Sequence, residues 1–163
     1  MKIYSYPYKK RTENSDKKII TSVREYIGKS EEQITVVRAD FGKPVLSGTE
    51  NIYVSVTHAE NLLLVAVSER GIGIDAEYQG RCVRNFTALA KRYFTKEELD
   101  FLGDNFTKDD FLHMWVKKEA QSKLTGRGIP DFKENNIFSE KFKISKVTDF
   151  TDFIIYIAEY KEN

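Results

Sequence analysis

The stretch NIYVSVTHAENLLLVAVSERGIGIDAEY, residues 51–78, decides the fold of this chain. It contains three short segments rich in β-branched and aliphatic residues, NIYVSVTH, NLLLVAVS and GIGIDAEY, separated by AE and by ERG. Short apolar runs divided by turn residues are typical of β-strands. We therefore predict an antiparallel meander over residues 51–78.

The sequence around this stretch alternates between strand and helix patterns. Residues 16–27 have apolar side chains at helical spacing and are followed by Gly28, and two further helices are expected to begin after the capping residues Thr95 and Thr107. A helical pattern also covers residues 83–93, and residues 40–51 are rich in turn formers and predict an exposed loop. The remaining predicted strands are residues 2–8, 33–39, 141–147 and 153–160. This order favours an α+β fold with antiparallel sheets.

The composition argues against several classes of function but does not identify one. The 163 residues include 26 Lys and Arg and 25 Asp and Glu, so a net charge of +1 gives no global argument for binding nucleic acid or a membrane. A single cysteine, Cys82, excludes an internal disulfide and a thiolate zinc site. The N-terminal residues have no apolar core of signal-peptide length, and the longest aliphatic run, LLLVAV, is too short to span a bilayer. A cytoplasmic protein is expected.

Two carboxylates share one face of the predicted strand GIGIDAEY. Because side chains alternate along a strand, Asp75 and Glu77 point to the same side, roughly 7 Å apart, and Gly73 leaves space beside them. Mg²⁺ prefers oxygen ligands and is usually held by one or two carboxylates together with substrate phosphates. The pattern fits such a site, and it equally fits a strand face that is simply exposed to water.

A third carboxylate, Glu119, lies on a helical stripe with the aromatic side chains of Phe111 and Trp115. Burying a carboxylate without a partner is costly. A metal ion held by Asp75 and Glu77 is one candidate partner, and Lys123, four residues further along the helix, is the other.

Basic residues accompany these acids. Lys118 and Lys123 flank Glu119 along the helix, and a metal beside lysines describes a site for a pyrophosphate, although a solvated helix face has the same pattern. His58 ends a strand at a tight turn, where it can donate to a phosphate or act only as a turn residue. In FGKP, Lys43 places a cation beside the rigid backbone of Pro44.

Taken together, these motifs resemble the 4′-phosphopantetheinyl transferase superfamily. The match is carried by FGKP at 41–44, VSVTHA at 54–59, GIGIDAE at 71–77, KRYFTKEEL at 91–99 and FLHMWVKKEAQSKLTGRGI at 111–129. A Gly-Ile-Asp-x-Glu strand followed at this distance by Trp-x-x-Lys-Glu-Ala-x-x-Lys is quite specific, and the resemblance covers roughly residues 40–130.

The resemblance implies transfer of the phosphopantetheine arm of coenzyme A to a serine of an apo acyl or peptidyl carrier protein, with release of adenosine 3′,5′-bisphosphate. It implies that Mg²⁺, or in its place Mn²⁺, is held by Asp75, Glu77 and Glu119. It leaves open whether Glu119 or water on the metal accepts the serine proton.

The same resemblance implies the residues that bind coenzyme A. His58 is expected to contact the 3′-phosphate, and Lys43 with Pro44 to line the nucleotide site. Lys118 and Lys123 are expected to bind the diphosphate, and Lys123 to neutralise the leaving phosphate. The candidate catalytic residues are therefore Glu119, Lys123 and Asp75.

FGKP and VSVTHA are similar to the longer, surfactin-synthetase-activating (Sfp) type of this superfamily. That type implies two pseudo-symmetric α+β halves with the active site in the cleft between them, here residues 1–70 on the nucleotide side, abbreviated, and residues 71–163 with the metal site and catalytic helix. A monomer is expected. The basic residues expected near the N-terminus do not align, and the candidates are Lys9, Lys10, Arg11, Lys17 and Lys18.

Two other functions are compatible with these residues. Clustered carboxylates and a lysine also serve other metal-dependent phosphoryl-transfer enzymes, such as nucleases, although the near-neutral charge disfavours a nucleic-acid substrate. A non-catalytic module that binds coenzyme A or a carrier protein is the third possibility, which the presence of all three carboxylates disfavours.

Overall fold

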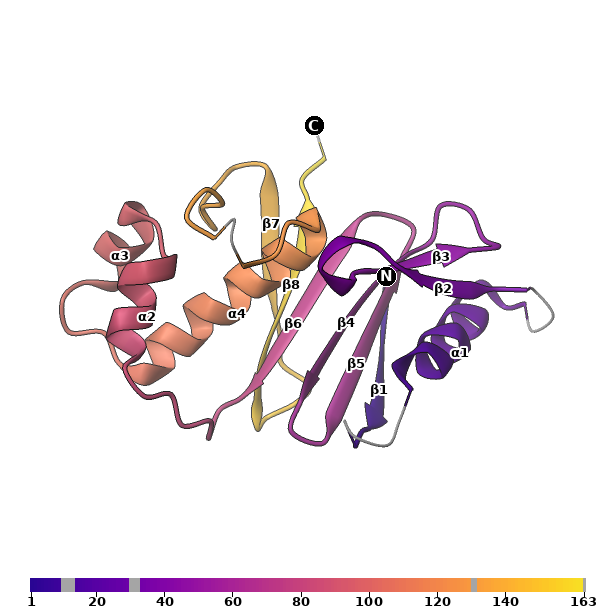
Figure 1. Cartoon of the computed structure of the whole chain (residues 1–163), viewed down its shortest axis with the longest axis horizontal. Coiled ribbons are helices and arrows are strands. Elements are labelled where there is room, and N and C mark those ends of the chain that lie inside the picture. Colours follow the sequence, from indigo (N-terminus) through magenta and orange to yellow (C-terminus); the bar gives the residue numbers. More distant parts are fainter. Residues whose placement is uncertain (10–13, 30–32, 130–131, 163) are drawn as a thin grey trace.

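The computed structural model describes residues 1–9, 14–29, 33–129 and 132–162. Figure 1 shows α1 beside the N-terminal strands and α2, α3 and α4 grouped together, with the long helix α4 lying across β6, β7 and β8. The elements are β1 (Lys2–Pro7), α1 (Ser15–Ile27), β2 (Thr35–Arg38), the 3₁₀ turn η1 (Asp40–Gly42), β3 (Pro44–Ser47), β4 (Tyr53–Ala59), β5 (Leu62–Ser68), β6 (Ile72–Tyr78), α2 (Phe86–Tyr93), α3 (Lys96–Leu102), α4 (Lys108–Thr125), β7 (Phe142–Val147) and β8 (Phe153–Tyr160). The predicted α+β class with antiparallel sheets is confirmed.

The helices begin and end where the sequence places their caps. The Thr95 hydroxyl accepts from the backbone N–H of Glu98, and Thr107 forms the same reciprocal capping box with Asp110. Helix α4 ends at Gly126, whose φ of 76° lies in the left-handed region that favours glycine. The helix predicted over residues 16–27 is α1, and it ends at Gly28.

The predicted meander is only partly correct. Strands β4 and β5 form a hairpin, with Ala59 opposite Leu62, but β1 occupies the other edge of β5, so the first sheet has the order β1-β5-β4. Strand β6 leaves this sheet and pairs with β8 in a second sheet of order β6-β8-β7. The short ERG turn is compatible with a third strand in the meander. Instead, the second partner of β5 is β1, from the N-terminal end of the chain, and the partner of β6 is β8, from the C-terminal end.

The predicted loop over residues 40–51 contains regular structure. Strand β3 pairs antiparallel with β2, with Pro44 opposite Arg38, to form a separate two-stranded ribbon. Pro44 is the first residue of β3, a position where the missing N–H of proline is tolerated. The turn η1 precedes it, so FGKP spans a tight turn and a strand start.

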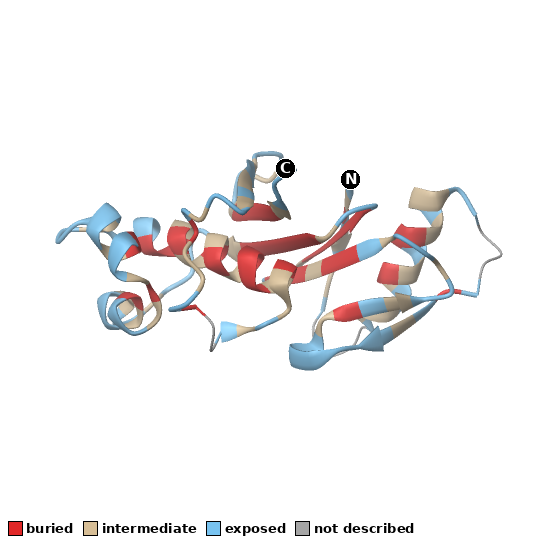
Figure 2. Cartoon of the chain, turned by 90° about the horizontal axis from the view of Figure 1, so that it is seen from above, coloured by how far each residue is buried: buried red, intermediate tan, exposed pale blue. Residues whose placement is uncertain are grey.

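Three apolar clusters hold the layers together. Helix α1 covers the first sheet with Ile19 and Val23, both fully buried. Helix α4 covers the second sheet, and Figure 2 shows buried residues along both the helix and the strands. A third cluster, which includes Leu64, Ile74 and Ile157, joins the two sheets.

Strands β4 and β6 meet along a seam that is bridged by side chains. The Ser55 hydroxyl accepts from the backbone N–H of Ile74 at 3.0 Å, and the Thr57 hydroxyl accepts from the N–H of Ala76 at 3.3 Å. These side chains satisfy backbone donors of β6 that no neighbouring strand reaches. The seam therefore fixes β6, which carries Asp75, against the first sheet.

Gly73 lets α4 lie directly on β6. A Cβ atom at this position would come within 2.0 Å of the backbone oxygen of Ala120. Because Ala120 follows Glu119, this close approach brings Glu119 to the strand that carries Asp75. No helix in the described parts of the chain combines the length and the apolar character needed to cross a membrane.

Candidate active site

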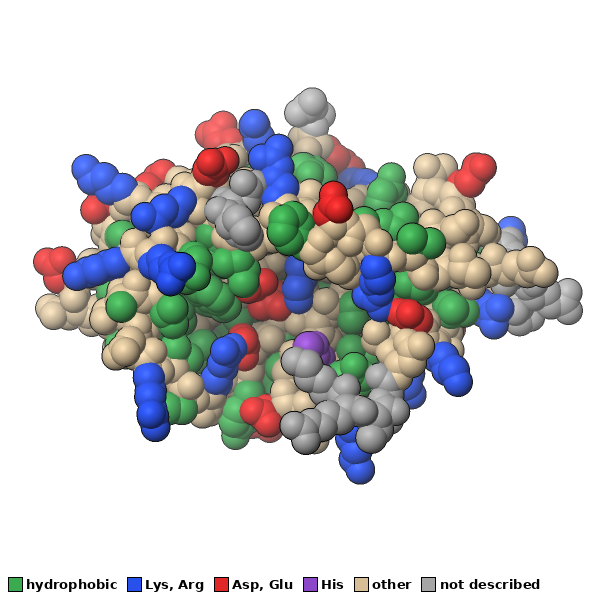
Figure 3. Space-filling view, in the orientation of Figure 1, with side chains coloured by type: hydrophobic (Ala, Val, Ile, Leu, Met, Phe, Trp, Pro, Cys, Tyr) green, Lys and Arg blue, Asp and Glu red, His purple; other side chains and the backbone are tan. Residues whose placement is uncertain are grey.

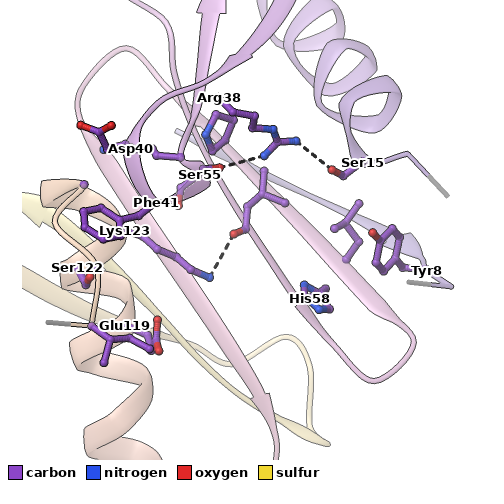
Figure 4. A pocket seen from close by; sticks show the side chains of 18 residues that line it. Tyr8, Ser15, Arg38, Asp40, Phe41, Ser55, His58, Glu119, Ser122 and Lys123 are labelled. Carbon is purple, nitrogen blue, oxygen red and sulfur yellow. Dashed lines mark hydrogen bonds between the residues drawn. The ribbon is translucent and has the colours of Figure 1, made fainter. Parts of the chain in front are cut away.

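A cavity of about 670 Å³ lies between the first sheet, the FGKP turn and the C-terminal part of α4. Figure 4 shows its lining, with Glu119 and Lys123 on one side and His58, Tyr8 and Arg38 on the other. Five of the predicted site residues line this cavity: Lys43, Pro44, His58, Glu119 and Lys123. The structure thus brings the FGKP motif and strand β4, which carries His58, close to the helix that carries Glu119 and Lys123.

Asp75 lies directly behind this wall. Asp75 is only 6% exposed, so it does not lie on a strand face that is simply exposed to water. The Thr57 hydroxyl donates to Asp75 Oδ1 at 2.9 Å, and Lys123 Nζ donates to the same oxygen at 2.7 Å. A buried carboxylate that accepts from two donors is held in a fixed position.

Lys123 connects α4 with two strands. Besides its ion pair with Asp75 on β6, its ammonium donates to the backbone oxygen of Val56 on β4 at 3.2 Å, as Figure 4 shows. The helical i, i+4 pair of Lys123 with Glu119, considered from sequence, is replaced by this contact with Asp75. Lys123 is thus a positioned cation at the cavity wall.

Glu119 is the most perturbed acid of the site. Burial, followed by the charge of Asp75, raises its pKa from 4.5 to about 7, and the opposing charges of Lys123 and Arg81 offset only part of this. Among the described residues, its carboxylate has no hydrogen-bond or ion-pair partner. Glu119 at the cavity wall is thus available to a bound cation or to a proton.

Glu77 is paired with a cation of the chain itself. Its carboxylate forms an ion pair with Arg81, four residues later in the chain. No three His, Cys, Asp or Glu side chains in the described ranges form a group that could hold a metal ion. Two of the three predicted ligands, Asp75 and Glu119, lie together, and two carboxylates are a donor set that suits Mg²⁺.

The prediction that Lys118 binds a diphosphate needs correction. Lys118 is 1% exposed and lies outside the cavity, and its ammonium donates to both carboxylate oxygens of Glu98 at 2.8 Å. A third bond reaches the backbone oxygen of Asn135 at 2.7 Å. Because successive residues of a helix lie about 100° apart, Lys118 points into the core between α3 and α4 while Glu119 faces the cavity.

His58 forms part of the far wall of the cavity. Its ring packs against that of Tyr8, with centroids 5.8 Å apart and the planes tilted by 59°. Tyr8 also lines the cavity and follows strand β1. The ring contact limits the orientations of the imidazole, which is useful for a side chain that donates to a ligand.

Lys43 lines the cavity with its stem and uses its ammonium elsewhere. Lys43 Nζ donates to the backbone oxygen of Leu124 at 2.7 Å, at the C-terminal end of α4. This cation satisfies a terminal carbonyl and complements the negative end of the helix dipole, while burial lowers the pKa of Lys43. The neighbouring Pro44 also lines the cavity.

Substituting Lys43 by methionine should lower the free energy of unfolding by about 1–2 kcal/mol, because a charged hydrogen bond and a helix-end cation are lost. Urea unfolding followed by circular dichroism measures the change. The exposed Lys141→Met variant is the control and should remain unchanged within ~0.5 kcal/mol. Equal stability of Lys43→Met and the wild type would show that the link to Leu124 contributes nothing.

Sequence reasoning missed two cavity residues, Arg38 shortly before FGKP and Phe41 within it. Arg38 donates to the backbone oxygen of Gly42 and to the Ser15 hydroxyl, both at 3.2 Å, and it forms an ion pair with Asp16. Phe41 is 70% exposed and has a φ of 56°, a conformation that residues other than glycine seldom adopt. The position of Phe41 in the FGKP motif was a sequence signal for a place in the site. Arg38 lies in none of the quoted motifs, so no sequence signal pointed to it.

Of the N-terminal basic candidates, the three that the structure describes contribute nothing to the lining of the cavity. Lys10 and Arg11 lie outside the described residues. Lys18 on α1 places its ammonium 4.9 Å from the centre of the Tyr6 ring. Lys9, Lys17 and Lys18 are not among the residues that line the cavity.

Comparison with known proteins agrees with this geometry. The family model described as the 4′-phosphopantetheinyl transferase superfamily matches residues 71–158, more than half of the chain. The 4′-phosphopantetheinyl transferase psf-1 of Bacillus pumilus is 33% identical over 101 residues, which are 60% of this chain and 42% of that protein. A 4′-phosphopantetheinyl transferase of Bacillus subtilis is 28% identical over 123 residues, 73% of this chain and 53% of that protein.

A third relative, the 4′-phosphopantetheinyl transferase Sfp of Bacillus subtilis strain 168, is 29% identical over 93 residues, 55% of this chain and 40% of that protein. The chain thus spans about half the length of the curated relatives that it matches. The matched region contains β6 and α4, which carry Asp75, Glu119 and Lys123. On these grounds, the chain belongs to the 4′-phosphopantetheinyl transferase superfamily.

Proposed function

We propose that this protein transfers the 4′-phosphopantetheine arm of coenzyme A to a serine of an apo acyl or peptidyl carrier protein. The observation that carries the proposal is that Glu119 and Lys123 line one cavity wall opposite His58, with Asp75 directly behind that wall and paired with Lys123. In the reaction, the serine oxygen forms a bond to the β-phosphorus, and the bond from that phosphorus to the bridging oxygen breaks. Adenosine 3′,5′-bisphosphate leaves.

The residues present fit a divalent cation, Mg²⁺ or Mn²⁺. Asp75 and Glu119 would hold it, because burial and the neighbouring charge of Asp75 raise the pKa of Glu119, and a cation would offset both effects. Such a cation supplies positive charge to the diphosphate as charge shifts to the leaving group. Glu77 can join as a third ligand at small cost, because its pair with the half-exposed Arg81 is of a kind worth at most ~1 kcal/mol.

Lys123 and Glu119 have complementary roles in this proposal. The ammonium of Lys123 lies at the cavity wall, where it stabilises negative charge on the leaving phosphate. The Glu119 carboxylate is also the candidate in this wall for accepting the serine proton, because burial and the charge of Asp75 favour its protonation. His58 would donate to the 3′-phosphate, and Lys43 and Pro44 would line the nucleotide site.

We further propose that residues 1–70 supply the nucleotide side of the cleft and residues 71–163 the metal site and catalytic helix. The two three-stranded sheets support this division. A monomer in the cytoplasm is the state we expect.

The test is to incubate the protein with coenzyme A, Mg²⁺ and several apo acyl and peptidyl carrier proteins. Mass spectrometry should show one added phosphopantetheine group on the carrier, and EDTA should prevent the addition. Omission of coenzyme A is the control. If coenzyme A binds and no carrier gains mass, the protein is a binding module and the proposed activity is wrong.

Replacing His58 by alanine should raise the KM for coenzyme A about tenfold and leave kcat within about threefold, because a bond to a phosphate stabilises substrate and transition state alike. The comparison substrate is 3′-dephospho-coenzyme A, for which the variant and the wild type should have equal KM values. If the His58→Ala variant also has a higher KM than the wild type for 3′-dephospho-coenzyme A, His58 does not act on the 3′-phosphate.

Replacing Arg81 by alanine should leave the affinity for Mn²⁺ unchanged or increase it up to about fivefold, because Glu77 is then free to join Asp75 and Glu119. Electron paramagnetic resonance of free Mn²⁺ measures the dissociation constant. The double variant Arg81→Ala/Glu77→Gln is the control and should lose any gain. Weaker Mn²⁺ binding by Arg81→Ala would assign Arg81 a supporting role.

A further inference from the structure

A group of four polar side chains gathers where α4 meets the second sheet, outside the cavity that contains Glu119. It is called the α4–β7 cluster here and consists of His113 and Lys117 on α4, Tyr156 on β8 and Lys146 on β7. None of the four lines the cavity. Lys117 precedes Glu119 by two residues, and a helix turns by about 100° per residue, so the two side chains point to different sides of α4. The cluster is therefore separate from the proposed active site.

Tyr156 lies at the centre of the cluster. It is only 8% exposed, and its hydroxyl forms a hydrogen bond of 3.1 Å with His113 Nδ1, with the two rings edge to face. The Lys117 ammonium is 5.2 Å from the centre of the Tyr156 ring. Lys146 is directly opposite Tyr156 in the ladder of β7 and β8, so the two side chains project from the same face of the sheet. Three elements thus direct these groups to one place.

Two cations of the cluster lie near the same imidazole. Burial, followed by the charges of Lys146 and Lys117, lowers the pKa of His113. Both ammonium groups are therefore close enough to His113 for their charges to act on it. This places two like charges beside a buried phenol and a half-buried ring.

Neither lysine of the cluster has an acidic partner. Lys117 and Lys146 form no ion pair with any described residue, and their ammonium groups donate no hydrogen bond to one. The two acids whose charges reach the cluster are engaged elsewhere, because Asp109 pairs with Lys108 and Asp110 belongs to the capping box of α4. A half-buried cation beside a second cation raises the free energy of the folded protein, and a bound anion would remove this cost.

The cluster also keeps a neutral hydrogen-bond donor in reserve. If the Tyr156 hydroxyl donates to His113 Nδ1, the Nε2–H of the imidazole is left over. If Nδ1–H donates to the phenol oxygen instead, the Tyr156 O–H is left over. Each neutral tautomer therefore leaves one donor beside the two ammonium groups, and protonation of the imidazole adds another.

We infer that the α4–β7 cluster binds a phosphate group, at a site distinct from the cavity proposed for coenzyme A. A phosphate carries up to two negative charges and at least three acceptor oxygens, which match two ammonium groups and a neutral donor. A carboxylate carries one charge and two oxygens, so it would leave one of the cations uncompensated. The inference does not depend on the proposed transferase function.

The two histidines of the chain allow both sites to be followed in one experiment. His58 lines the cavity, whereas His113 belongs to the α4–β7 cluster. Figure 3 shows one histidine side chain on this face of the molecule, among acidic and basic side chains between α4 and α1. Imidazole signals in a ¹H–¹³C NMR spectrum therefore report separately on the two sites.

The test is a titration of the whole chain with inorganic phosphate at constant ionic strength. The His113 signals should shift and saturate, with a dissociation constant in the millimolar range or tighter, and the same constant should be found in His58→Ala. Lys117→Met/Lys146→Met should weaken this binding at least ~10-fold, because both charged donors are lost. Lys141→Met/Lys143→Met, at exposed positions on and before β7, is the matched control and should bind like the wild type.

Further variants separate binding from folding. Tyr156→Phe should weaken phosphate binding about fivefold, because it removes one hydroxyl from the network. Lys117→Met/Lys146→Met should be at least as stable to urea as the wild type in phosphate-free buffer, because an unpaired pair of like charges is gone. Should the double variant not fold, Lys146→Met changes an exposed position alone and should still weaken binding.

The choice of anion decides what the site takes. Tighter binding of glycerol 3-phosphate than of inorganic phosphate would assign the site to a phosphorylated metabolite, and the reverse order would assign it to the free ion. Equal shifts of the His113 signals with sodium acetate would show an unselective anion site and overturn the inference. Signals of His113 that stay fixed while phosphate is added, or that move without saturating, would overturn it as well.

Discussion

Replacing Glu119 by glutamine should reduce phosphopantetheine transfer at least ~10³-fold and, at the same time, stabilise the metal-free protein above pH 7. The loss of transfer follows because the amide is neutral, so it neither offsets the charge of a cation nor accepts the serine proton. The gain in stability follows because the amide removes a half-buried charge that lies beside Asp75.

The direction of the pH dependence follows from the raised pKa of Glu119. Between about pH 4.5, where this group titrates in the unfolded chain, and about pH 7, where it titrates in the folded protein, the folded protein keeps a proton that the unfolded chain has lost. The free energy of unfolding therefore falls as the pH rises through this window, by roughly 3 kcal/mol at most. The contribution is fully present below pH 4.5.

Urea unfolding in EDTA at pH 5 and pH 8 measures this effect. Glu119→Gln and the wild type should have similar stability at pH 5, and the variant should be the more stable of the two at pH 8. Saturating Mg²⁺ should stabilise the wild type and not the variant, because only a bound ligand shifts the unfolding equilibrium. A variant that is less stable than the wild type at pH 8, or that transfers at a near-normal rate, would contradict the assignment of Glu119.

Replacing Lys118 by methionine should lower the free energy of unfolding by about 3–5 kcal/mol. The substitution leaves the carboxylate of Glu98, which is fully buried, without its cation, and breaking a buried pair by removing one partner is strongly destabilising. The backbone N–H groups of Ile137 and Thr95 still donate to Glu98, at 2.9 and 2.8 Å, but two neutral donors do not replace an ammonium.

The double variant Glu98→Gln/Lys118→Met separates charge from packing. It should recover a large part of the lost stability, because no buried charge remains unpaired. Folded Lys118→Met at low temperature should retain a KM for coenzyme A near that of the wild type. A selective rise in that KM, without a loss of stability, would restore the interpretation of Lys118 as a diphosphate ligand.

The contrast between Lys118 and Lys123 shows what residue spacing along a helix can predict and what it cannot. Both lysines lie in one motif, but a helix turns by about 100° per residue, so only Lys123, four positions after Glu119, faces the same side. The partner of Lys118 is Glu98 on another helix, which no spacing in the motif reveals. Helix ends were predictable because caps act within a few residues, as Thr95 and Thr107 show.

Strand partners were harder to predict for the same reason. The meander assigned β6 to the sheet of β5, because neighbouring strands pair more often than distant ones. The actual partners, β1 for β5 and β8 for β6, lie at opposite ends of the chain. Arg38 and Ser15 likewise meet only through the tertiary fold.

The contacts of Lys123 with Val56 and of Lys43 with Leu124 have a consequence for the order of folding. They join residues 67 and 81 positions apart in the chain. Closing such long loops is entropically costly, so contacts of this kind form late, after the local helices and hairpins. A newly made chain would therefore acquire its reactive centre in one of the last steps of folding, and intermediates with native-like secondary structure would still be catalytically silent.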